Sequence, residues 1–585
     1  MKRCFLFLLI IFFIATPVSC LNKGVIDVTQ LTMSDELELL DKGVITSYEL
    51  GNLYLDRINT YNDTFKAIIT VNPNVLEEAK EMDELRSKGE IKGRLHGVFI
   101  VVKDNVDVVG MPTTAGAKAL SDNYPLEDAP IVKRLKDEGA IIIGKANMSE
   151  FAFSARDSNS SYGYVSNAFR VGYTSYGSSG GSAVSVALNF GSAAIGTDTN
   201  SSIRLPAAAA GLVGLRPTYG KLSNDGIIAY DVYRDTAGIL TKSVEDNALI
   251  MEVLTDEEYN LEIDQTIRIG VPKSFYMDSF APIKEMFEEE IVRLEQDGIE
   301  IVYLDNYYGS KEAGYNTNSV AGFTMCRAFN EYIVKTDGKI TSFKELSKSK
   351  GKITNLSGYY KSCNYSDKEI KKVMSQKEKL KKHVDKIYSD YDLDYIMYPV
   401  TKNELYQKGD KDKLLNNSRT VSSTIGYPSI VVPLGYYDEM PYGLELMGKV
   451  NEEGSLYKIA NLIEKHNNLI NSHDSAAKRL YVVDETVKRL VVLYLDNYGN
   501  PEKEEWLNKV YRYFRNYNEL EETEINAQLL IDEFYATKEN TEKNEDDDIR
   551  LIYGLSFLFM LIWPYSKRYV ERRKRVNNIL YYANL

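Results

Sequence analysis

Cysteine and histidine are scarce in this chain of 585 residues, which contains four of each. Cys4 and Cys20 lie in an apolar N-terminal segment, so only Cys326 and Cys363 remain in the body of the chain. Two distant cysteines exclude a disulfide framework and a CxxC zinc site, although they leave a single bridge open. The histidines form no HxH or HxxxH pair, and the sequence therefore predicts no metal site and no cofactor.

An excess of basic residues is also missing. The chain has 70 Lys and Arg against 84 Asp and Glu, which gives a formal net charge of −14. A chain-wide basic surface for nucleic acid is therefore absent, and we predict no nucleic-acid partner. Hydrophobic residues make up 44% and charged residues 26%, which is typical of a globular protein with a large core.

Both ends of the chain carry apolar runs. Residues 1–20 begin with Lys2 and Arg3, continue as an apolar run and end in small residues, which predicts a signal peptide or an N-terminal anchor, with lipidation of Cys20 left open. Residues 551–565 read LIYGLSFLFMLIWPY. As a helix they would span about 22 Å of a hydrocarbon core of about 30 Å, so a transmembrane helix and a buried or interfacial helix both remain open.

Basic residues flank both apolar runs on their outer sequence side. By the positive-inside rule both ends would stay inside and the body would lie outside. This predicts an exported protein, extracellular or on the cell surface, with membrane association.

Between the two ends the composition changes once. Residues 21–474 predict one α/β domain, because strand-like runs such as GVFIVV (97–102) and AIIIG (140–144) alternate with helical patterns such as APIVKRLKDEG (129–139). Residues 475–548 are rich in Glu, Lys, Asn and Tyr with apolar residues at helical spacing, which predicts a helical acidic appendage. Residues 549–585 hold the second apolar segment and a basic tail.

Two Gly/Ser-rich stretches contain candidate nucleophiles. In the first, Gly177-Ser178-Ser179-Gly180-Gly181 matches G-x-S-x-G, which would make Ser179 the nucleophile of an α/β-hydrolase and would require an acid and a histidine later in the chain. The second, GTDTNSSIRLPA (196–207), places Ser201 beside Ser202 with no histidine nearby. A serine nucleophile needs a base, so this stretch raises the question of what deprotonates it.

Lys103 is a candidate base that needs no histidine. It ends the apolar run in LHGVFIVVKDN. Burial lowers the pKa of a lysine, and a neutral lysine can act as a general base in Ser-Lys catalysis. The alternative is a side chain that extends its charge from the end of a buried strand to solvent.

The order of KDN, GSSGGS and GTDTxxSIRxPA resembles the amidase signature family. The likeness continues through residues 128–153, 207–223, 235–254, 391–401 and 425–448, and it covers about residues 40–470. It implies an α/β amidase signature fold, in which a central mixed, twisted β-sheet is covered by helices on both faces, here followed by the C-terminal helical appendage. It also implies hydrolysis of a carboxylic amide C–N bond through an acyl-enzyme.

The resemblance further implies a Ser-cisSer-Lys triad. Lys103 is then the base, Ser178 the bridging serine held by a cis peptide, and Ser202 the nucleophile. The oxyanion and substrate-binding residues would be Thr199, Asn200 and Ser201, and the supporting residues Asp198, Arg204 and Ser179.

Asn200 and Ser201 depart from the family pattern, which has glycines at both positions. Glycine allows a positive φ and a close approach of backbone to substrate. We therefore expect the two side chains to narrow the oxyanion pocket or to tilt its donors.

Three functions fit these observations. The first is an exported amidohydrolase that acts on a small-molecule or peptide amide. The second is an amidotransferase A-type subunit that releases ammonia from an amide, a role that is intracellular and needs partner subunits. The third is a weakly active, membrane-associated binding protein with the amidase fold. The sequence leaves the amide and the oligomeric state open.

Overall fold

The computed structural model describes residues 28–305, 319–364, 367–410 and 420–467. The predicted N-terminal signal peptide or anchor, the acidic appendage and the apolar C-terminal segment lie outside the described residues, and so remain predictions. Of the helices in the described part of the chain, none combines the length and the apolar character that a membrane crossing requires.

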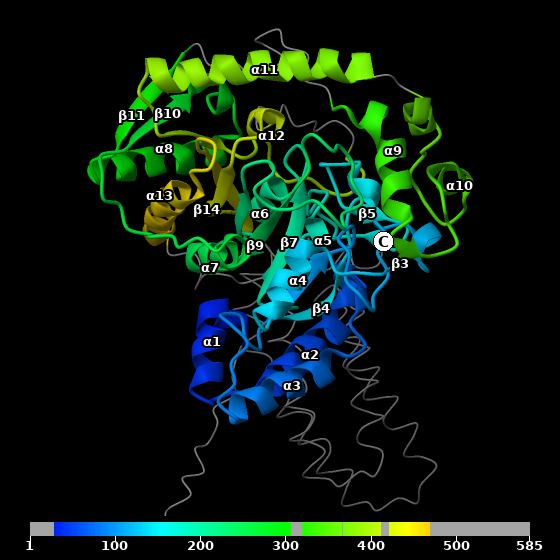
Figure 1. Cartoon of the computed structure of the whole chain (residues 1–585). Coiled ribbons are helices and arrows are strands. Elements are labelled where there is room, and N and C mark those ends of the chain that lie inside the picture. The colour runs from blue at the N-terminus through cyan, green and yellow to red at the C-terminus, as the bar shows by residue number, and fades with distance from the viewer. Residues whose placement is uncertain (1–27, 306–318, 365–366, 411–419, 468–585) are drawn as a thin grey trace, which may run out of the picture.

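A mixed sheet of 11 strands forms the centre of the molecule (Figure 1). Its strands are β1 (Ile68–Val71), β2 (Phe99–Lys103), β4 (Ile141–Ala146), β7 (Ala193–Asp198), β8 (Val213–Arg216), β9 (Thr236–Thr241), β10 (Arg268–Pro272), β11 (Glu300–Leu304), β13 (Tyr395–Pro399), β14 (Ser429–Tyr437) and β15 (Met440–Met447). Their order is β1-β4-β2-β7-β9-β8-β14-β15-β13-β10-β11. Strand β2 is parallel to β4 and β7, and β10 is parallel to β11 and β13, whereas the other pairs are antiparallel.

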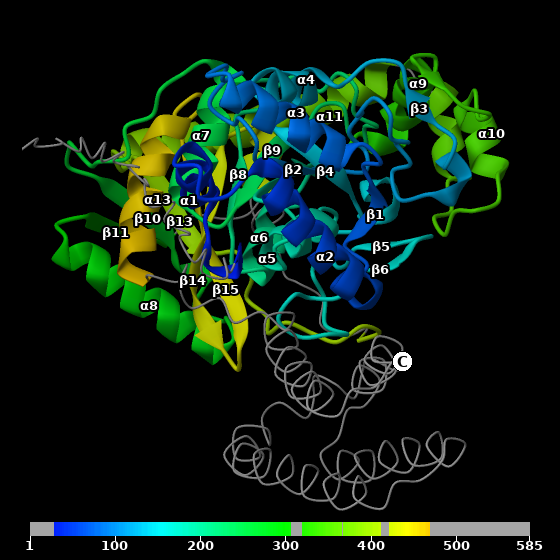
Figure 2. The same ribbon diagram turned by 90° about the horizontal axis from the view of Figure 1, so that it is seen from below.

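Helices cover both faces of this sheet (Figures 1 and 2). They are α1 (Met33–Asp41), α2 (Ser47–Phe65), α3 (Val75–Ser87), α4 (Pro130–Asp137), α5 (Gly180–Ala187), α6 (Arg204–Ala209), α7 (Val244–Thr255), α8 (Ala281–Gln296), α9 (Ala321–Ile333), α10 (Phe343–Lys348), α11 (Asp367–Asp390), α12 (Thr420–Ile425) and α13 (Glu453–Asn467). Two small two-stranded sheets, β3 (Tyr124–Pro125) with β12 (Thr336–Asp337) and β5 (Asn159–Ser160) with β6 (Gly163–Tyr164), lie apart from the main sheet. The predicted α/β fold class is confirmed.

The local sequence explains the elements that carry the site. Every residue of β2 and β4 is buried, which suits their runs of β-branched residues and their parallel pairing inside the sheet. Helix α4 begins with a proline at its first position, where the missing N–H costs nothing. The strands expected at 97–102 and 140–144 and the helix expected at 129–139 are confirmed, with small shifts of their ends.

The topology brings two segments of the predicted site to one edge of the sheet. Strands β2 and β7 are parallel neighbours, with Val102 opposite Ile195. Lys103 ends β2 and Asp198 ends β7, so the loop that follows β7 begins at the edge where Lys103 lies. Helix α5, which begins directly after Ser179, packs against both strands.

A disulfide joins Cys326 on α9 to Cys363 on the short 3-10 helix η5 (Tyr359–Asn364). The two Cα atoms are 5.1 Å apart. Cys326 is fully buried in a small second hydrophobic cluster that includes Met325 and Phe329. The single bridge that the sequence left open is thus present in the fold.

Candidate active site

Lys103 is completely buried and surrounded by neutral oxygen atoms. Its Nζ lies 2.7 Å from Ser178 Oγ and 2.8 Å from Ser179 Oγ. It also lies 2.8 Å from Thr197 Oγ1 and 3.2 Å from the carbonyl oxygen of the same residue. Lys103 therefore does not extend to solvent, and its amino group points into the cluster of hydroxyls.

This environment favours the neutral amine. Burial lowers the pKa of Lys103 to about 7, and the carboxylates of Asp198 and Asp235 offset only part of that effect. A neutral amine has two N–H donors and one lone pair. At neutral pH a large fraction of Lys103 can accordingly accept a proton from a neighbouring hydroxyl.

Ser178 and Ser179 both contact Lys103, but their remaining hydrogen bonds differ. Ser179 Oγ donates to the carbonyl oxygen of Thr197 at 3.1 Å and accepts from the N–H of Thr197 at 3.3 Å. The hydroxyl proton of Ser179 is thus engaged by the backbone. Ser178, by contrast, has Lys103 as the hydrogen-bond partner of its hydroxyl within the described residues, and the peptide bond between Gly177 and Ser178 is cis.

The loop that contains Ser202 is attached directly to this pair. The N–H of Ser179 donates to the carbonyl oxygen of Ser202 at 3.1 Å, which joins the loop before α5 to the loop before α6. Close packing also limits the first of these loops, because a Cβ on Gly177 or Gly181 would overlap a backbone carbonyl oxygen. Ser202 itself is 4% exposed. The backbone bond from Ser179 places Ser202 in a loop that adjoins the pair of Lys103 and Ser178.

The backbone of the Ser202 loop offers hydrogen-bond donors. Within the described residues, the N–H groups of Thr199, Asn200, Ser201 and Ser202 donate to no other protein group. The Ser201 hydroxyl is buried and likewise has no partner there. Free donors beside a serine hydroxyl are what stabilisation of an oxyanion requires.

Asp198 and Arg204 hold this loop from inside the protein. The Asp198 carboxylate accepts from the N–H of Ile203 at 3.0 Å and from Arg204 Nε at 3.2 Å. Arg204 also contacts the carbonyl oxygen of Asn200. Both charged side chains are completely buried, so they are part of the core that shapes the loop and do not form a surface ion pair.

Two further charged residues complete this network. Arg216 Nη1 lies 3.2 Å from Asp198 Oδ1, and Arg204 Nη1 pairs with Glu445 on β15. Burial raises the pKa of Asp198, but the two arginines outweigh it, so that the pKa of this carboxyl is below its usual value. The Asp198 carboxylate is therefore charged and fully engaged at neutral pH.

Asn200 is held by its side chain as well as by its backbone. Its Oδ1 accepts from Arg234 Nη1 at 2.9 Å, and its carbonyl oxygen accepts from Ser423 Oγ at 3.1 Å. Neither Asn200 nor Ser201 has a positive φ. The conformation of the backbone here does not require glycine, and the expected narrowing of the oxyanion pocket stays a prediction.

Several residues of the site were not predicted from the sequence. Thr197 lies within the quoted GTDT motif, where its place one residue before Asp198 was the available signal. Arg216, Arg234 and Glu445 gave no local signal, because each reaches the site from a distant segment. Among the described residues, no group of three or more His, Cys, Asp or Glu is arranged to hold a metal ion.

The α/β-hydrolase hypothesis finds no support in this geometry. The partners of Ser179 Oγ are Lys103 and Thr197, and neither is a histidine. His466 on α13 contacts Glu290 and Asp297 instead. His473 lies outside the described residues.

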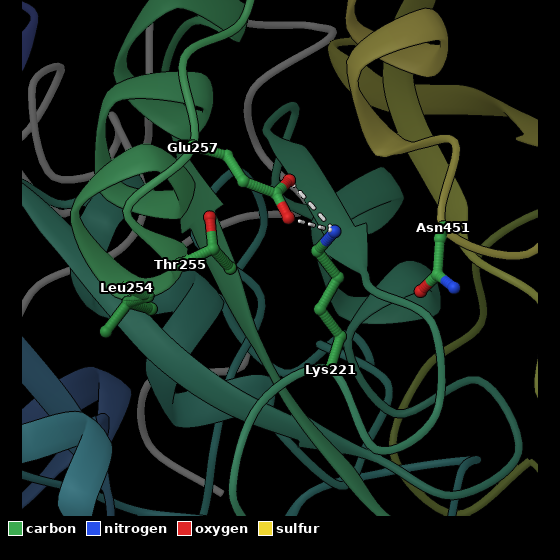
Figure 3. A pocket seen from close by; sticks show the side chains of 5 residues that line it. All are labelled: Lys221, Leu254, Thr255, Glu257 and Asn451. Atoms are coloured by element: carbon green, nitrogen blue, oxygen red, sulfur yellow. Dashed lines mark hydrogen bonds and ion pairs between the residues drawn. The ribbon is translucent and has the colours of Figure 1, made fainter.

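A surface pocket elsewhere is lined by Lys221, Leu254, Thr255, Glu257 and Asn451 (Figure 3). In it Lys221 Nζ contacts both carboxylate oxygens of Glu257, at 2.8 and 2.9 Å. None of the residues predicted for the active site lines this pocket. It therefore does not compete with the Lys103 cluster as the catalytic centre.

A buried lysine on a serine hydroxyl, next to a serine loop with free backbone N–H groups, has the parts that Ser-Lys hydrolysis needs. A model of the Amidase family matches residues 49–457 of the chain. The chain therefore belongs to the amidase family and is a C–N hydrolase. The resemblance inferred from the sequence motifs is confirmed.

Relatives in sequence include components of amidotransferases. The A-type subunit of the glutamyl-tRNA(Gln) amidotransferase of Natranaerobius thermophilus is 30% identical over 471 residues, which cover 74% of this chain and 95% of the relative. The corresponding protein from Exiguobacterium sp. is 32% identical over 466 residues, with coverage of 73% and 96%.

Similar solved structures include a peptide amidase and an amidotransferase subunit. The native peptide amidase from Stenotrophomonas maltophilia has a TM-score of 0.68 and 27% identity, and the match covers 75% of this chain and 98% of that one. The A-type subunit of the glutamyl-tRNA(Gln) amidotransferase from Thermotoga maritima has a TM-score of 0.59 and 25% identity, with coverage of 76% and 96%.

Proposed function

We propose that this protein hydrolyses a carboxylic amide with Ser202 as nucleophile, Ser178 as proton relay and Lys103 as base. The observation that carries the proposal is the 2.7 Å contact between Lys103 Nζ and Ser178 Oγ in a fully buried site. Ser178 suits the relay better than Ser179, because the Ser179 hydroxyl proton is engaged by the carbonyl oxygen of Thr197.

In the first half of the reaction, neutral Lys103 takes the proton of Ser178 as Ser178 takes that of Ser202. The Ser202 Oγ then bonds to the amide carbon, and the carbonyl oxygen becomes an oxyanion near the free N–H groups of residues 199–202. The same relay returns the proton to the amide nitrogen, the C–N bond breaks, and the amine leaves. In the second half, water loses a proton to the relay, attacks the acyl-enzyme carbon and releases the acid and Ser202.

Two biological roles use this chemistry. In the first the protein is an exported amidohydrolase of a small-molecule or peptide amide, a role supported by the structural likeness to peptide amidase. In the second it is an ammonia-releasing component that works with partner subunits, a role supported by the sequence relatives that belong to amidotransferases. The sequence relatives favour the second role.

The disulfide between Cys326 and Cys363 favours the first role. Disulfides persist mainly in oxidising compartments and are rare in the cytosol of mesophiles. Together with the signal-like residues 1–20, the bridge supports export of the body and, through the apolar segment 551–565, membrane association.

The full chain and Ser202→Ala, assayed on simple primary and secondary amides, test the chemistry. Release of ammonia or amine that Ser202→Ala abolishes is the expected result. Absence of any turnover by the wild type would favour the binding-protein alternative. Protease treatment of intact cells, followed by a carbonate wash of the membranes, separates the two roles, because only an exported body is cleaved from outside.

A further inference from the structure

Lys377 on helix α11 is a buried lysine. Its side chain is 3% exposed, and its Nζ has no hydrogen-bond partner among the described residues. A buried ammonium group is costly unless it is paired. An unpaired one beside an active site indicates a place for an anionic ligand.

The charged residues that shift the pKa of Lys377 lie in and around the Ser202 loop. They are Arg234, Asp231, Arg216 and Asp235. Three of them hold that loop. Arg234 donates to Asn200 Oδ1, Arg216 contacts the carbonyl oxygen of Asp198, and Asp235 accepts from Thr199 Oγ1 at 2.5 Å.

The packing of the helices agrees with this location. Helix α11 runs along one side of the molecule and packs on α12 (Figure 1). Ser423 on α12 donates to the carbonyl oxygen of Asn200. Helix α11, which carries Lys377, is therefore connected through α12 to the loop before Ser202.

The two acidic residues of this region are already engaged by other donors. Asp231 Oδ2 accepts from Ser319 Oγ at 2.7 Å and from the N–H of Val320 at 2.9 Å. Asp235 accepts from Thr199 through one oxygen and from the N–H groups of Tyr230 and Asp231 through the other. Neither carboxylate hydrogen-bonds to Lys377, whose charge is left for another partner.

We propose that Lys377, with Arg234 beside it, binds a carboxylate on the substrate, so that the amide cleaved at this site carries a negative charge in its acyl part or in its leaving amine. The inference rests on the proposed function and names its substrate class. A carboxylate on the ammonium group would supply the missing partner of Lys377 and place the scissile amide near the loop of Ser202.

The protonation of Lys377 supports this assignment. The pKa of Lys377 is lowered to about 8, and burial is the main cause. Arg234 and Arg216 also lower this pKa, and their combined effect is larger than the opposite effect of Asp231 and Asp235. The ammonium form therefore predominates below about pH 8. Binding of a carboxylate should weaken as the pH rises above that value.

Matched pairs of amides test the inference. The monoamide of glutaric acid is compared with pentanamide, and N-acetyl-β-alanine with N-propylacetamide, so that each pair differs by one carboxylate on a known side of the scissile bond. We expect the wild type to prefer the charged member of one pair. Lys377→Met should raise KM for that compound about ten- to a hundredfold and leave kcat and the uncharged amide nearly unchanged.

Controls separate this inference from the function on which it rests. Lys377→Arg should retain most of the preference, and Lys386→Met, which removes an exposed lysine of the same helix, should retain all of it. Free glutarate should slow labelling of Ser202 by a fluorophosphonate in the wild type and not in Lys377→Met.

Two results would overturn the proposal in different ways. Equal kcat/KM for charged and uncharged amides, in the wild type and in Lys377→Met, would contradict the carboxylate subsite. It would not contradict the proposed hydrolase function. No hydrolysis of any amide and no labelling of Ser202 in the wild type would overturn the proposed function itself.

Discussion

The backbone N–H of Ser179 donates a hydrogen bond of 3.1 Å to the carbonyl oxygen of Ser202. This bond joins the loop that contacts Lys103 to the loop that contains the proposed nucleophile. The three serines of these loops have different roles. Ser202 is the proposed nucleophile, Ser179 anchors the loops, and Ser178 retains a hydroxyl that can relay a proton. The first prediction follows from that division.

Ser202→Ala should lower the turnover of an amide by at least about ten-thousandfold, because it removes the attacking oxygen. A fluorophosphonate should label the Ser202 peptide in the wild type, as mass spectrometry can show. Ser179→Ala is the matched control, and it should keep the label at Ser202 while losing only part of the rate. Labelling at Ser179 would contradict this assignment.

Lys103→Met should abolish most of the activity and leave the fold intact, because it keeps an apolar stem of similar length in a buried site. In the wild type, kcat/KM for a neutral amide should rise as the pH rises through about 7, since Lys103 must lose its proton to act as base and burial lowers its pKa to that value. A pH profile of kcat/KM checks this. A rate that falls over the same interval would show that the protonated form is the active one.

For an amide that carries a carboxylate, the pH profile should have a second limb. The rate should fall as the pH rises above about 8, because Lys377 then loses the charge that binds the substrate. The falling limb should disappear in Lys377→Met and should be absent for neutral amides. A falling limb that survives in Lys377→Met would assign it to another group.

Asn200→Gly should destabilise the protein by about 1–3 kcal/mol, because it removes the Oδ1 acceptor of a hydrogen bond from the buried Arg234 side chain. Since neither Asn200 nor Ser201 has a positive φ, we expect no gain in turnover from Asn200→Gly combined with Ser201→Gly. Urea unfolding and steady-state kinetics measure the two effects. A rise in turnover of tenfold or more would show that the side chains do crowd the oxyanion pocket.

Glu445→Gln should cost about 1–3 kcal/mol of unfolding free energy, because it removes the negative charge that pairs with the completely buried guanidinium of Arg204. Lys133→Ala, which breaks an exposed pair with Asp137, is the matched control and should have no measurable effect. Equal effects of the two substitutions in denaturant titrations would be inconsistent with a structural role for the Arg204 network.

Reduction of the Cys326–Cys363 bridge should lower the stability by about 3–4 kcal/mol, the loop-entropy value for cysteines separated by 37 residues. Thermal unfolding with and without a reductant measures this difference, and the double variant Cys326→Ser with Cys363→Ser should be insensitive to the reductant. Peptide mapping of the protein isolated from its native compartment should find the two cysteines joined. If both thiols are free there, the bridge no longer supports export.

Much of the fold and the triad could be predicted from sequence because the signals are local. The apolar run 97–102 and the small residues of 177–183 indicate a buried strand and a tightly packed turn before a helix, and the order of three motifs indicates the family. The ends of these elements differ from the predicted ends by one or two residues, because hydrogen bonds at the last turn decide the boundary. The pairing of Cys326 with Cys363 was beyond the sequence, because it depends on how α9 and η5 pack.

The sequence by itself determined which residue types stand at the ends of strands and in the loops, and thereby the family and the catalytic candidates Lys103, Ser178 and Ser202. Only the tertiary structure decided how these groups are charged and held. The pKa of Lys103 depends on complete burial, and the loop before α6 depends on Glu445, which lies 241 residues from its partner Arg204. The same holds for Lys377, whose burial on α11 without a hydrogen-bond partner among the described residues no local pattern indicates. The reason is physical: local pattern selects strand or helix, whereas desolvation and hydrogen-bond partners are set by whatever distant segments the fold brings into contact.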